Sequence, residues 1–185
     1  MPPDYQPDVA SFLCNQRIHE FNEWRLKNLT VRLNLDGIDL SGLNLSGAFL
    51  NGASCIGSDF SRSNLRRTNL VQSELVGANF EKSDLSFALL MYSDLSRCIL
   101  SKADLTGTNL MWANLSDSDL SYCTMSKTIL VESNLSHVDL TGVDSSSAFL
   151  IYAKTEKPIE EYRQSVDPRT YINGNRDGSD FVGNR

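Results

Sequence analysis

The chain has 185 residues, of which 41% are hydrophobic and 22% charged, and its formal net charge is -6 at pH 7. This composition is typical of one soluble domain, and the mild negative charge counts against direct binding of nucleic acid. No apolar run is long enough to span a bilayer, and the start of the chain lacks the basic and apolar regions of a signal peptide, so we expect no membrane association.

The first expected element is a helix over residues 9–26, within an N-terminal segment that spans residues 1–30. Asp8 can cap the start of this helix. His19 is interpreted as a surface or capping residue rather than a ligand. Apolar residues follow with approximate helical spacing, namely Phe12, Leu13, Ile18, Phe21 and Trp24.

From Val31 to Leu150 the chain repeats every five residues without an insertion or deletion. Every fifth residue from Leu35 onward forms a series of 24 positions, of which 22 are Leu, Phe or Met. Two residues earlier, 19 of 24 positions hold Ala, Ser, Thr or Cys. A period of five fits neither a helix nor a strand. It indicates a solenoid in which the large and the small residue both point inward.

We name the five places of each unit, in chain order, the small, preceding, core, following and corner positions. All eight glycines of the repeat lie at the corner position, two residues after the core residue. A chain that turns every five residues needs conformational freedom at this place.

The units Ala103-Asp104-Leu105-Thr106-Gly107 and Ala113-Asn114-Leu115-Ser116-Asp117 resemble the motif of the pentapeptide-repeat family. This resemblance implies an all-β solenoid over residues 31–152, a right-handed quadrilateral parallel β-helix of about six coils with four pentapeptides each. Its length is expected to be about 24 Å. The stretch from Phe21 to Arg25 resembles the amphipathic helix that often precedes such repeats, so Phe21 and Trp24 are expected to cap the first coil.

The C-terminal segment spans residues 153–185. Pro158 can open a short helix that runs to about Ser165, since proline is well placed in a first helical turn. Residues 167–185 are rich in Asn, Gly, Arg and Asp and are predicted to be a flexible tail.

In a coil of twenty residues, one side carries the core residues Leu50, Leu70, Leu90, Leu110, Leu130 and Leu150. Twelve of its 18 outward positions are apolar or aromatic, against five of 54 on the other three sides, and Glu132 is its single charge. A patch of about 24 by 10 Å with this composition is typical of an interface. The predicted interface residues are Phe49, Val71, Leu89, Met91, Tyr92, Met111, Trp112, Ile129, Val131, Phe149, Ile151 and Tyr152.

We therefore expect a non-enzymatic scaffold that uses this side for self-association or for binding a protein partner. A second interpretation is that the C-terminal segment covers part of the side with its own apolar residues, which are Ile159, Tyr162, Val166, Tyr171 and Ile172.

The resemblance also implies an alternative function, a DNA-mimicking protein that binds a type II topoisomerase and protects it from quinolones or toxins. A column of acidic residues on one side would suit such mimicry, namely Asp39, Asp59, Asp119 and Asp139. A basic cluster counts against it, namely Arg62, Arg66, Arg67, Lys82, Arg97 and Lys102.

A catalytic interpretation finds little support in the sequence. The carboxylates recur at the preceding position, where we expect them to bind local backbone, and no phosphate loop, zinc spacing or dinucleotide fingerprint is present. We predict no catalytic residue, cofactor or metal. Three of the four cysteines, Cys55, Cys98 and Cys123, occupy inward positions. They are interpreted as buried thiols of a cytoplasmic, bacterial protein in a reducing environment.

Overall fold

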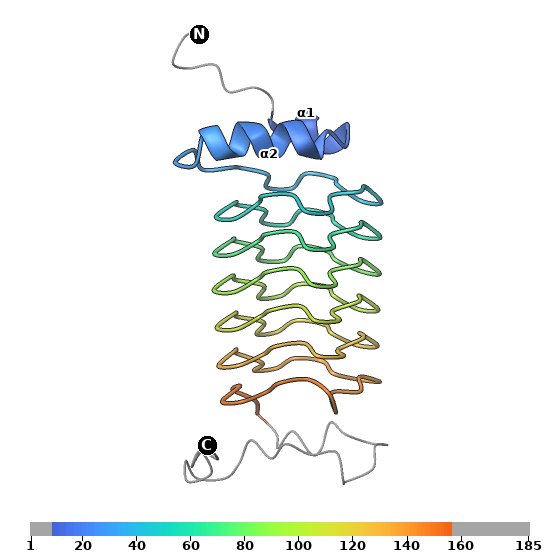
Figure 1. Ribbon diagram of the computed structural model, residues 1–185. Coiled ribbons are helices and arrows are strands. Elements are labelled where there is room, and N and C mark those ends of the chain that lie inside the picture. Colours follow the sequence, from blue (N-terminus) through green and yellow to red (C-terminus); the bar gives the residue numbers. More distant parts are fainter. Residues whose placement is uncertain (1–8, 157–185) are drawn as a thin grey trace, which may run out of the picture.

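The computed structural model describes residues 9–156. Two short helices lie across one end of a straight stack of coils (Figure 1). Helix α1 spans Val9–Cys14 and helix α2 spans Ile18–Lys27. The predicted cap at Asp8, the C-terminal helix and the tail lie outside the described residues.

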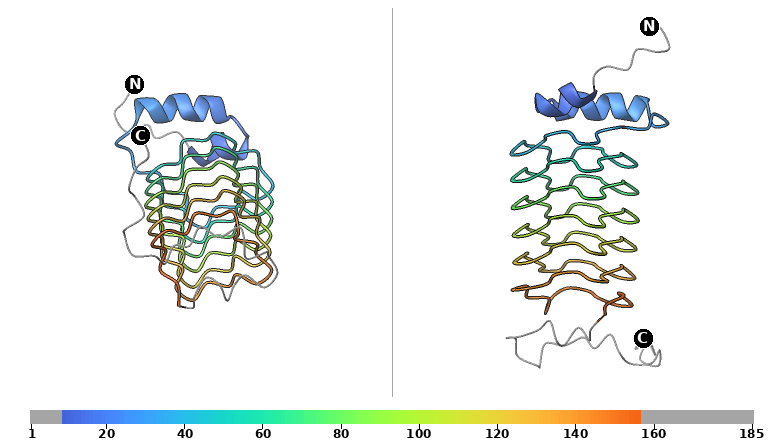
Figure 2. Two further views of the ribbon diagram at one scale, coloured as in Figure 1. Left: turned by 60° about the horizontal axis from the view of Figure 1, so that its bottom comes forward. Right: turned by 180° about the vertical axis from the view of Figure 1, so that it is seen from behind.

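The N-terminal helix expected over residues 9–26 is divided in two, because the chain turns at Gln16. This residue has a φ of +56°. Its N–H donates to the carbonyl of Leu13 at 2.9 Å, and the N–H of Arg17 donates to the carbonyl of Phe12 at 2.8 Å. The two bonds form a Schellman motif, which ends a helix at a residue in the left-handed conformation. His19 is exposed on α2. This helix lies across the end of the stack (Figure 2).

Each coil pairs with the next through parallel β-bridges between residues twenty apart. The described residues contain 21 such bridges, from Asn34↔Ser54 to Asn134↔Lys154. All are isolated bridges, so the coils contain single paired residues rather than long strands. Four pentapeptides therefore complete one coil. We call residues 33–52, which form four whole units, coil 1, the next twenty residues coil 2, and so on.

The interior of the stack is a packed column of large core residues. Nearly all of them are fully buried, and the stacked rings of Phe60 and Phe80 lie 5.0 Å apart between centroids. Leu140 and Leu150, in the last coil, are half-buried. Burial of one Leu or Phe contributes about 1.5–3 kcal/mol of transfer free energy, so this column supplies the main stabilisation of the fold.

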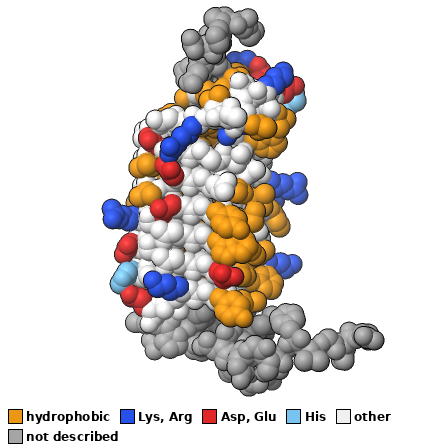
Figure 3. Space-filling model, turned by 90° about the vertical axis from the view of Figure 1, so that its left-hand side faces the viewer, with side chains coloured by type: hydrophobic (Ala, Val, Ile, Leu, Met, Phe, Trp, Pro, Cys, Tyr) orange, Lys and Arg blue, Asp and Glu red, His pale blue; other side chains and the backbone are white. Residues whose placement is uncertain are grey.

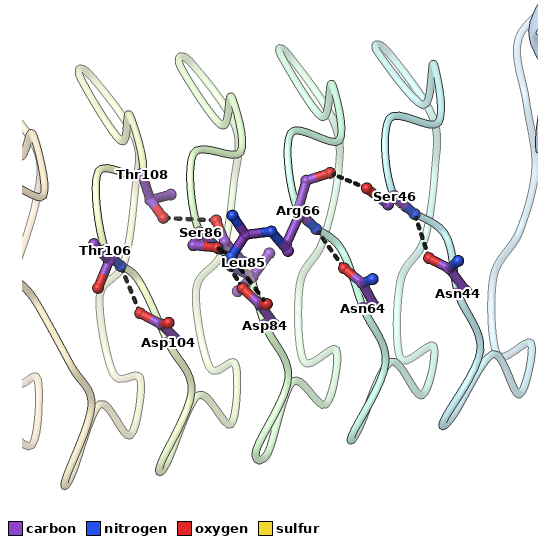
Figure 4. A network of polar contacts seen from close by, with 10 residues as sticks. All are labelled: Asn44, Ser46, Asn64, Arg66, Asp84, Leu85, Ser86, Asp104, Thr106 and Thr108. Carbon is purple, nitrogen blue, oxygen red and sulfur yellow. Dashed lines mark hydrogen bonds and ion pairs between the residues drawn. The ribbon is translucent and has the colours of Figure 1, made fainter.

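Polar residues at the small position, with the exception of Ser83, are accommodated because their hydroxyl or thiol groups donate to buried carbonyls. The Thr108 hydroxyl donates to the carbonyl of Leu85 at 2.7 Å (Figure 4). The Cys98 thiol donates in the same way to the carbonyl of Leu75 at 3.0 Å. Each of these bonds joins a coil to the one before it, which removes the penalty for burying a polar group.

Candidate functional site

The twelve side chains predicted as an interface lie along one side of the stack. Bridges join Asn69 to Leu89 and Asn109 to Ile129. The neighbouring column is held in register by ladder bonds, as where the N–H of Tyr92 donates to the carbonyl of Met111 at 3.1 Å. We call the preceding, following and corner positions around the six core leucines of this side, Leu50 to Leu150, the apolar face.

All twelve side chains are accessible to solvent. Figure 3 shows apolar side chains gathered in a strip along the stack, with a carboxylate interrupting it. The exposed members are Leu89, Tyr92, Trp112, Phe149, Ile151 and Tyr152. The half-buried members are Phe49, Val71, Met91, Met111, Ile129 and Val131.

The middle of the apolar face carries a pair of stacked aromatic rings. The ring centroids of Tyr92 and Trp112 lie 4.7 Å apart with an interplanar angle of 11°. Both residues sit at corner positions of adjacent coils, with φ values of +60° and +58°. Stacking on each other limits the rotamers of both rings. The face therefore presents a partly preorganised aromatic surface, which lowers the ordering cost of binding.

The apolar face departs more often than the other three sides from a turn-stabilising pattern of the stack, at four of its six preceding positions against four of eighteen elsewhere. All sixteen Asp and Asn residues at preceding positions from 34 to 149 accept a hydrogen bond from the backbone N–H two residues later. Figure 4 shows four of them. Eight preceding positions hold other residues, and half of these lie on the apolar face, namely Phe49, Leu89, Ile129 and Phe149. The fold does not require these substitutions, so they point to a role for the exposed surface.

Two columns of corner residues border the apolar face. Those on the edge that ends each of its units are Gly52, Gln72, Tyr92, Trp112, Glu132 and Tyr152. Those on the edge shared with the preceding side are Gly47, Arg67, Phe87, Gly107, Lys127 and Ser147.

Phe87 lies on the second edge of the apolar face, at a corner that this face shares with the neighbouring side. A Cβ atom at Gly107 would lie 2.8 Å from Phe87 Cδ1, so the ring covers this glycine. The Arg66 guanidinium lies 5.7 Å from the ring centroid. Phe87 is 48% exposed and was missing from the predicted interface, because the sequence assigned it to the neighbouring side. The sequence could have suggested Phe87 as an interface residue, because a corner position is shared by two sides.

The predicted acidic column lies on the side opposite the apolar face. Bridges join Asp39 to Asp59 and Asp119 to Asp139, with an asparagine and an isoleucine between the two pairs. Hydrogen bonds from the Ser41 side chain and backbone lower the pKa of Asp39 below its usual range. The carboxylates thus cap local turns, as the sequence predicted.

A basic column runs beside these acids. Arg62, Lys82 and Lys102 occupy the corner positions of the same side, twenty residues apart. Lys82 Nζ pairs with Glu81 Oε1 at 2.7 Å. This side therefore carries both signs of charge rather than the uniform negative potential of a DNA backbone.

The cysteines have the environment of structural thiols. Burial raises the pKa of Cys55, Cys98 and Cys123 to about 12 in each case, so all three are protonated at neutral pH and poor nucleophiles. Cys14 is exposed. Within residues 9–156 no group of three His, Cys, Asp or Glu side chains could hold a metal ion. No helix in this part of the chain has the length and apolar character needed to cross a membrane.

The two predicted capping residues lie at the interface between α2 and coil 1. Phe21 is fully buried within the core, and Trp24 is half-buried against it. Their ring centroids lie 6.5 Å apart. The helix thus closes the open end of the hydrophobic interior with two aromatic side chains.

Two further residues of α2 were not predicted, and they satisfy backbone groups of coil 1. Asn22 Nδ2 donates to the carbonyl of Gly47, and Asn22 Oδ1 accepts from the N–H of Phe49, both at 2.9 Å. Arg25 Nη2 donates to the carbonyl of Asn51 at 2.9 Å. In later coils the preceding coil supplies the partners of the groups that correspond to the Phe49 N–H and the Asn51 carbonyl. The position of Asn22 and Arg25 next to Phe21 and Trp24 in the sequence was the signal that could have suggested a capping role. Their hydrogen-bond partners could not be predicted, because they depend on how α2 packs on coil 1.

Comparison with known proteins identifies the family of the repeat. A family model described as "Pentapeptide repeats" matches the chain with eight copies, over residues 34–70, 68–107, 78–117 and 108–144. No curated protein matches the chain.

Similar solved structures are pentapeptide repeat proteins. HetL, involved in heterocyst differentiation regulation in the cyanobacterium Nostoc sp. strain PCC 7120, is 28% identical over 65% of this chain and 69% of its own, with a TM-score of 0.31. A protein from the Arabidopsis thaliana thylakoid lumen is 31% identical over 64% and 72%, with a TM-score of 0.31. QnrB1, a plasmid-mediated fluoroquinolone resistance protein, is 20% identical over 68% and 82%, with a TM-score of 0.30.

Proposed function

Since the chain belongs to the pentapeptide-repeat family, we propose that it is a non-enzymatic scaffold that binds another protein surface through the apolar face. The alignment of twelve accessible apolar side chains on one side of the stack supports this function. A contiguous apolar patch on the surface of a soluble protein often serves an interaction.

The proposed scaffold has the architecture expected of the family, a right-handed quadrilateral β-helix of about six coils, with α1 and α2 closing one end. Such a framework suits binding, because ladder bonds between coils fix the backbone of the apolar face and leave little to order on association. We also propose a cytoplasmic, reducing environment, supported by three buried, unpaired thiols.

The mixed charge of the opposite side disfavours the alternative of topoisomerase binding by DNA mimicry. The prediction that apolar residues from 159 to 172 cover part of the apolar face falls outside the described residues. Such a cover and a binding role are compatible, since a short helix is too small to cover six coils.

The experiment places charge in the middle of the apolar face. The double variant Met91→Lys/Trp112→Lys should lose association, because two desolvated ammonium groups would have no partners. Association is measured by sedimentation velocity and by pull-down from lysate of the source cell. The matched control is Ile56→Lys/Tyr122→Lys, which changes an exposed following residue and an exposed corner residue on other sides.

Both double variants should unfold within a few degrees of the wild type when followed by circular dichroism. Loss of association in the first variant alone supports the proposed function. Wild-type protein that stays monomeric at high concentration, with partners shared equally by both variants, contradicts it.

A further inference from the structure

The proposed function leaves open what covers the apolar face, and its two bordering columns carry a pattern that points to a second copy of the same chain. Consider a face-to-face dimer whose twofold axis runs parallel to the stack. The column from Gly52 to Tyr152 of each copy then lies against the column from Gly47 to Ser147 of its partner. Matching coils then lie at the same height, since rotation about that axis leaves height along the stack unchanged.

The charges on the two columns match in this arrangement. Coil 5 carries Glu132 on one edge of the apolar face and Lys127 on the other. In the parallel dimer each Glu132 faces the partner's Lys127, so two ion pairs form. Neither side chain takes part in an ion pair within residues 9–156, and both are exposed. In coil 2, Gln72 of one copy likewise faces Arg67 of the other copy, whose guanidinium can donate to the amide oxygen of Gln72.

The sizes of the side chains match as well. In coils 3 and 4 one edge presents the stacked rings of Tyr92 and Trp112. The opposite edge presents Phe87, whose ring lies over Gly107. The aromatic pair of one copy thus meets a single ring and a residue without a side chain on the other. In coil 1 both edges are glycine, Gly52 and Gly47.

The antiparallel alternative is disfavoured by charge. A twofold axis perpendicular to the stack and through its middle would bring each column against the same column of the partner, reversed in direction. Coil 2 would then face coil 5, so Arg67 would meet Lys127 of the partner twice. Like charges directly opposite each other destabilise such a contact.

We propose that the apolar face is the interface of a parallel homodimer, with coils in register and Glu132 of each copy paired with Lys127 of the other. This inference rests on the proposed function and names the partner of the same face. The expected patch of about 24 by 10 Å is smaller than a standard interface of about 800 Å² per partner, so we expect weak dimerisation, with a dissociation constant in the micromolar range.

The test is a charge-reversal cycle measured by sedimentation equilibrium at about 50 mM salt. Glu132→Lys and Lys127→Glu should each weaken dimerisation about tenfold or more, because each replaces two attractive contacts by two repulsive ones. The double variant Glu132→Lys/Lys127→Glu should return to within about threefold of the wild type. These differences should shrink at 0.5 M salt, since ions screen exposed charges.

Arg97→Glu is the matched control, because it reverses an exposed corner charge with a φ of +59° on an edge away from the apolar face. It should leave dimerisation unchanged. Circular dichroism of every variant checks that the fold is retained.

The outcomes distinguish a failure of the parallel homodimer from a failure of the binding role of the apolar face. If the wild type dimerises and Met91→Lys/Trp112→Lys abolishes the dimer, but the double reversal fails to restore affinity, the parallel register is wrong and the binding face stands. A wild type that is monomeric at millimolar concentration overturns the homodimer, whereas a partner lost only by the Met91→Lys/Trp112→Lys variant still supports a binding face. If that variant changes nothing, both proposals fail.

Discussion

At the scale of the residue, the corner position decides how the chain can turn every five residues. From residue 37 to residue 152, every corner except Ser147 has a positive φ, and fifteen of these corners are not glycine. The left-handed conformation costs a residue with a Cβ atom about 1–2 kcal/mol. The ladder bond at the corner helps to enforce it, as where the N–H of Arg62 donates to the carbonyl of Glu81 at 2.9 Å.

We predict that alanine is tolerated unequally at two corner glycines. A Cβ at Gly77 would meet no atom within 4 Å, whereas one at Gly107 would lie 2.8 Å from two atoms of the Phe87 ring. Gly77→Ala should lower the free energy of unfolding by about 1 kcal/mol through conformation alone, and Gly107→Ala by more. Urea unfolding measures both values.

A double-mutant cycle supplies the control for this prediction. In a Phe87→Ala background, Gly107→Ala should have the same effect as Gly77→Ala, because the ring that the Cβ would displace is absent. Equal effects of the two glycine substitutions in the wild type would contradict the steric interpretation.

Alkaline pH should destabilise the fold through its buried thiols. The pKa values of Cys55, Cys98 and Cys123 are raised from 9.0 to about 12. Above pH 9 the thiols of the unfolded chain lose protons and those of the folded chain keep them, so stability falls as pH rises. The slope is at most about 1.4 kcal/mol per pH unit for each thiol, and below pH 9 this effect is absent.

The variant Cys98→Ser/Cys123→Ser should flatten this dependence between pH 9 and pH 12. Serine fills the small position elsewhere and makes the same bond, as where the Ser118 hydroxyl donates to the carbonyl of Leu95 at 2.8 Å. Denaturant unfolding across this pH range gives the slope directly. An unchanged slope in the variant would show that other groups control alkaline stability.

At the scale of the element, α2 takes the place of a preceding coil. A terminal coil exposes unpaired backbone groups and apolar interior. Phe21 covers the interior, and the side chains of Asn22 and Arg25 bind backbone groups that would otherwise lack partners. Arg25 also donates to the carbonyl of Val31 at 2.7 Å, which fixes the entry of the chain into coil 1.

We predict that Asn22→Ala lowers the free energy of unfolding by about 1–3 kcal/mol, because it leaves the N–H of Phe49 and the carbonyl of Gly47 without this partner. Leu26→Ala is the control on the same helix, since Leu26 is 59% exposed, and it should stay within about 0.5 kcal/mol of the wild type. Hydrogen exchange provides a local readout. The Phe49 amide should exchange faster in Asn22→Ala, and an unchanged rate would refute the capping role.

At the scale of the whole molecule, stacking turns a one-dimensional repeat into four sides with different properties. The apolar face has a single charge, while the opposite side alternates acids with the basic column of Arg62, Lys82 and Lys102. Binding by mimicry of DNA depends on a dense field of one sign, since electrostatic attraction dominates protein binding to phosphate backbones.

We therefore expect no protection of DNA gyrase. In a supercoiling assay with ciprofloxacin, the added protein should leave the inhibitory concentration of the drug unchanged at up to a tenfold molar excess over the enzyme. QnrB1, a fluoroquinolone resistance protein, serves as the positive control. Protection by this chain that is lost when Asp39 and Asp59 are replaced by asparagine would reverse this conclusion.

The sequence by itself determined the register of the stack, because a large residue every five and a small residue two before it admit few other ways to bury both. Together with the four units per coil that the resemblance to pentapeptide repeats implies, it also located the twelve residues of the apolar face. The tertiary structure decided what depends on contacts between distant residues. Gln16 ends α1 through a backbone conformation that its residue type does not favour, and Asn22 acquires partners only when α2 lies across coil 1. The Phe87 ring lies over Gly107, a side-chain orientation that no period in the sequence encodes.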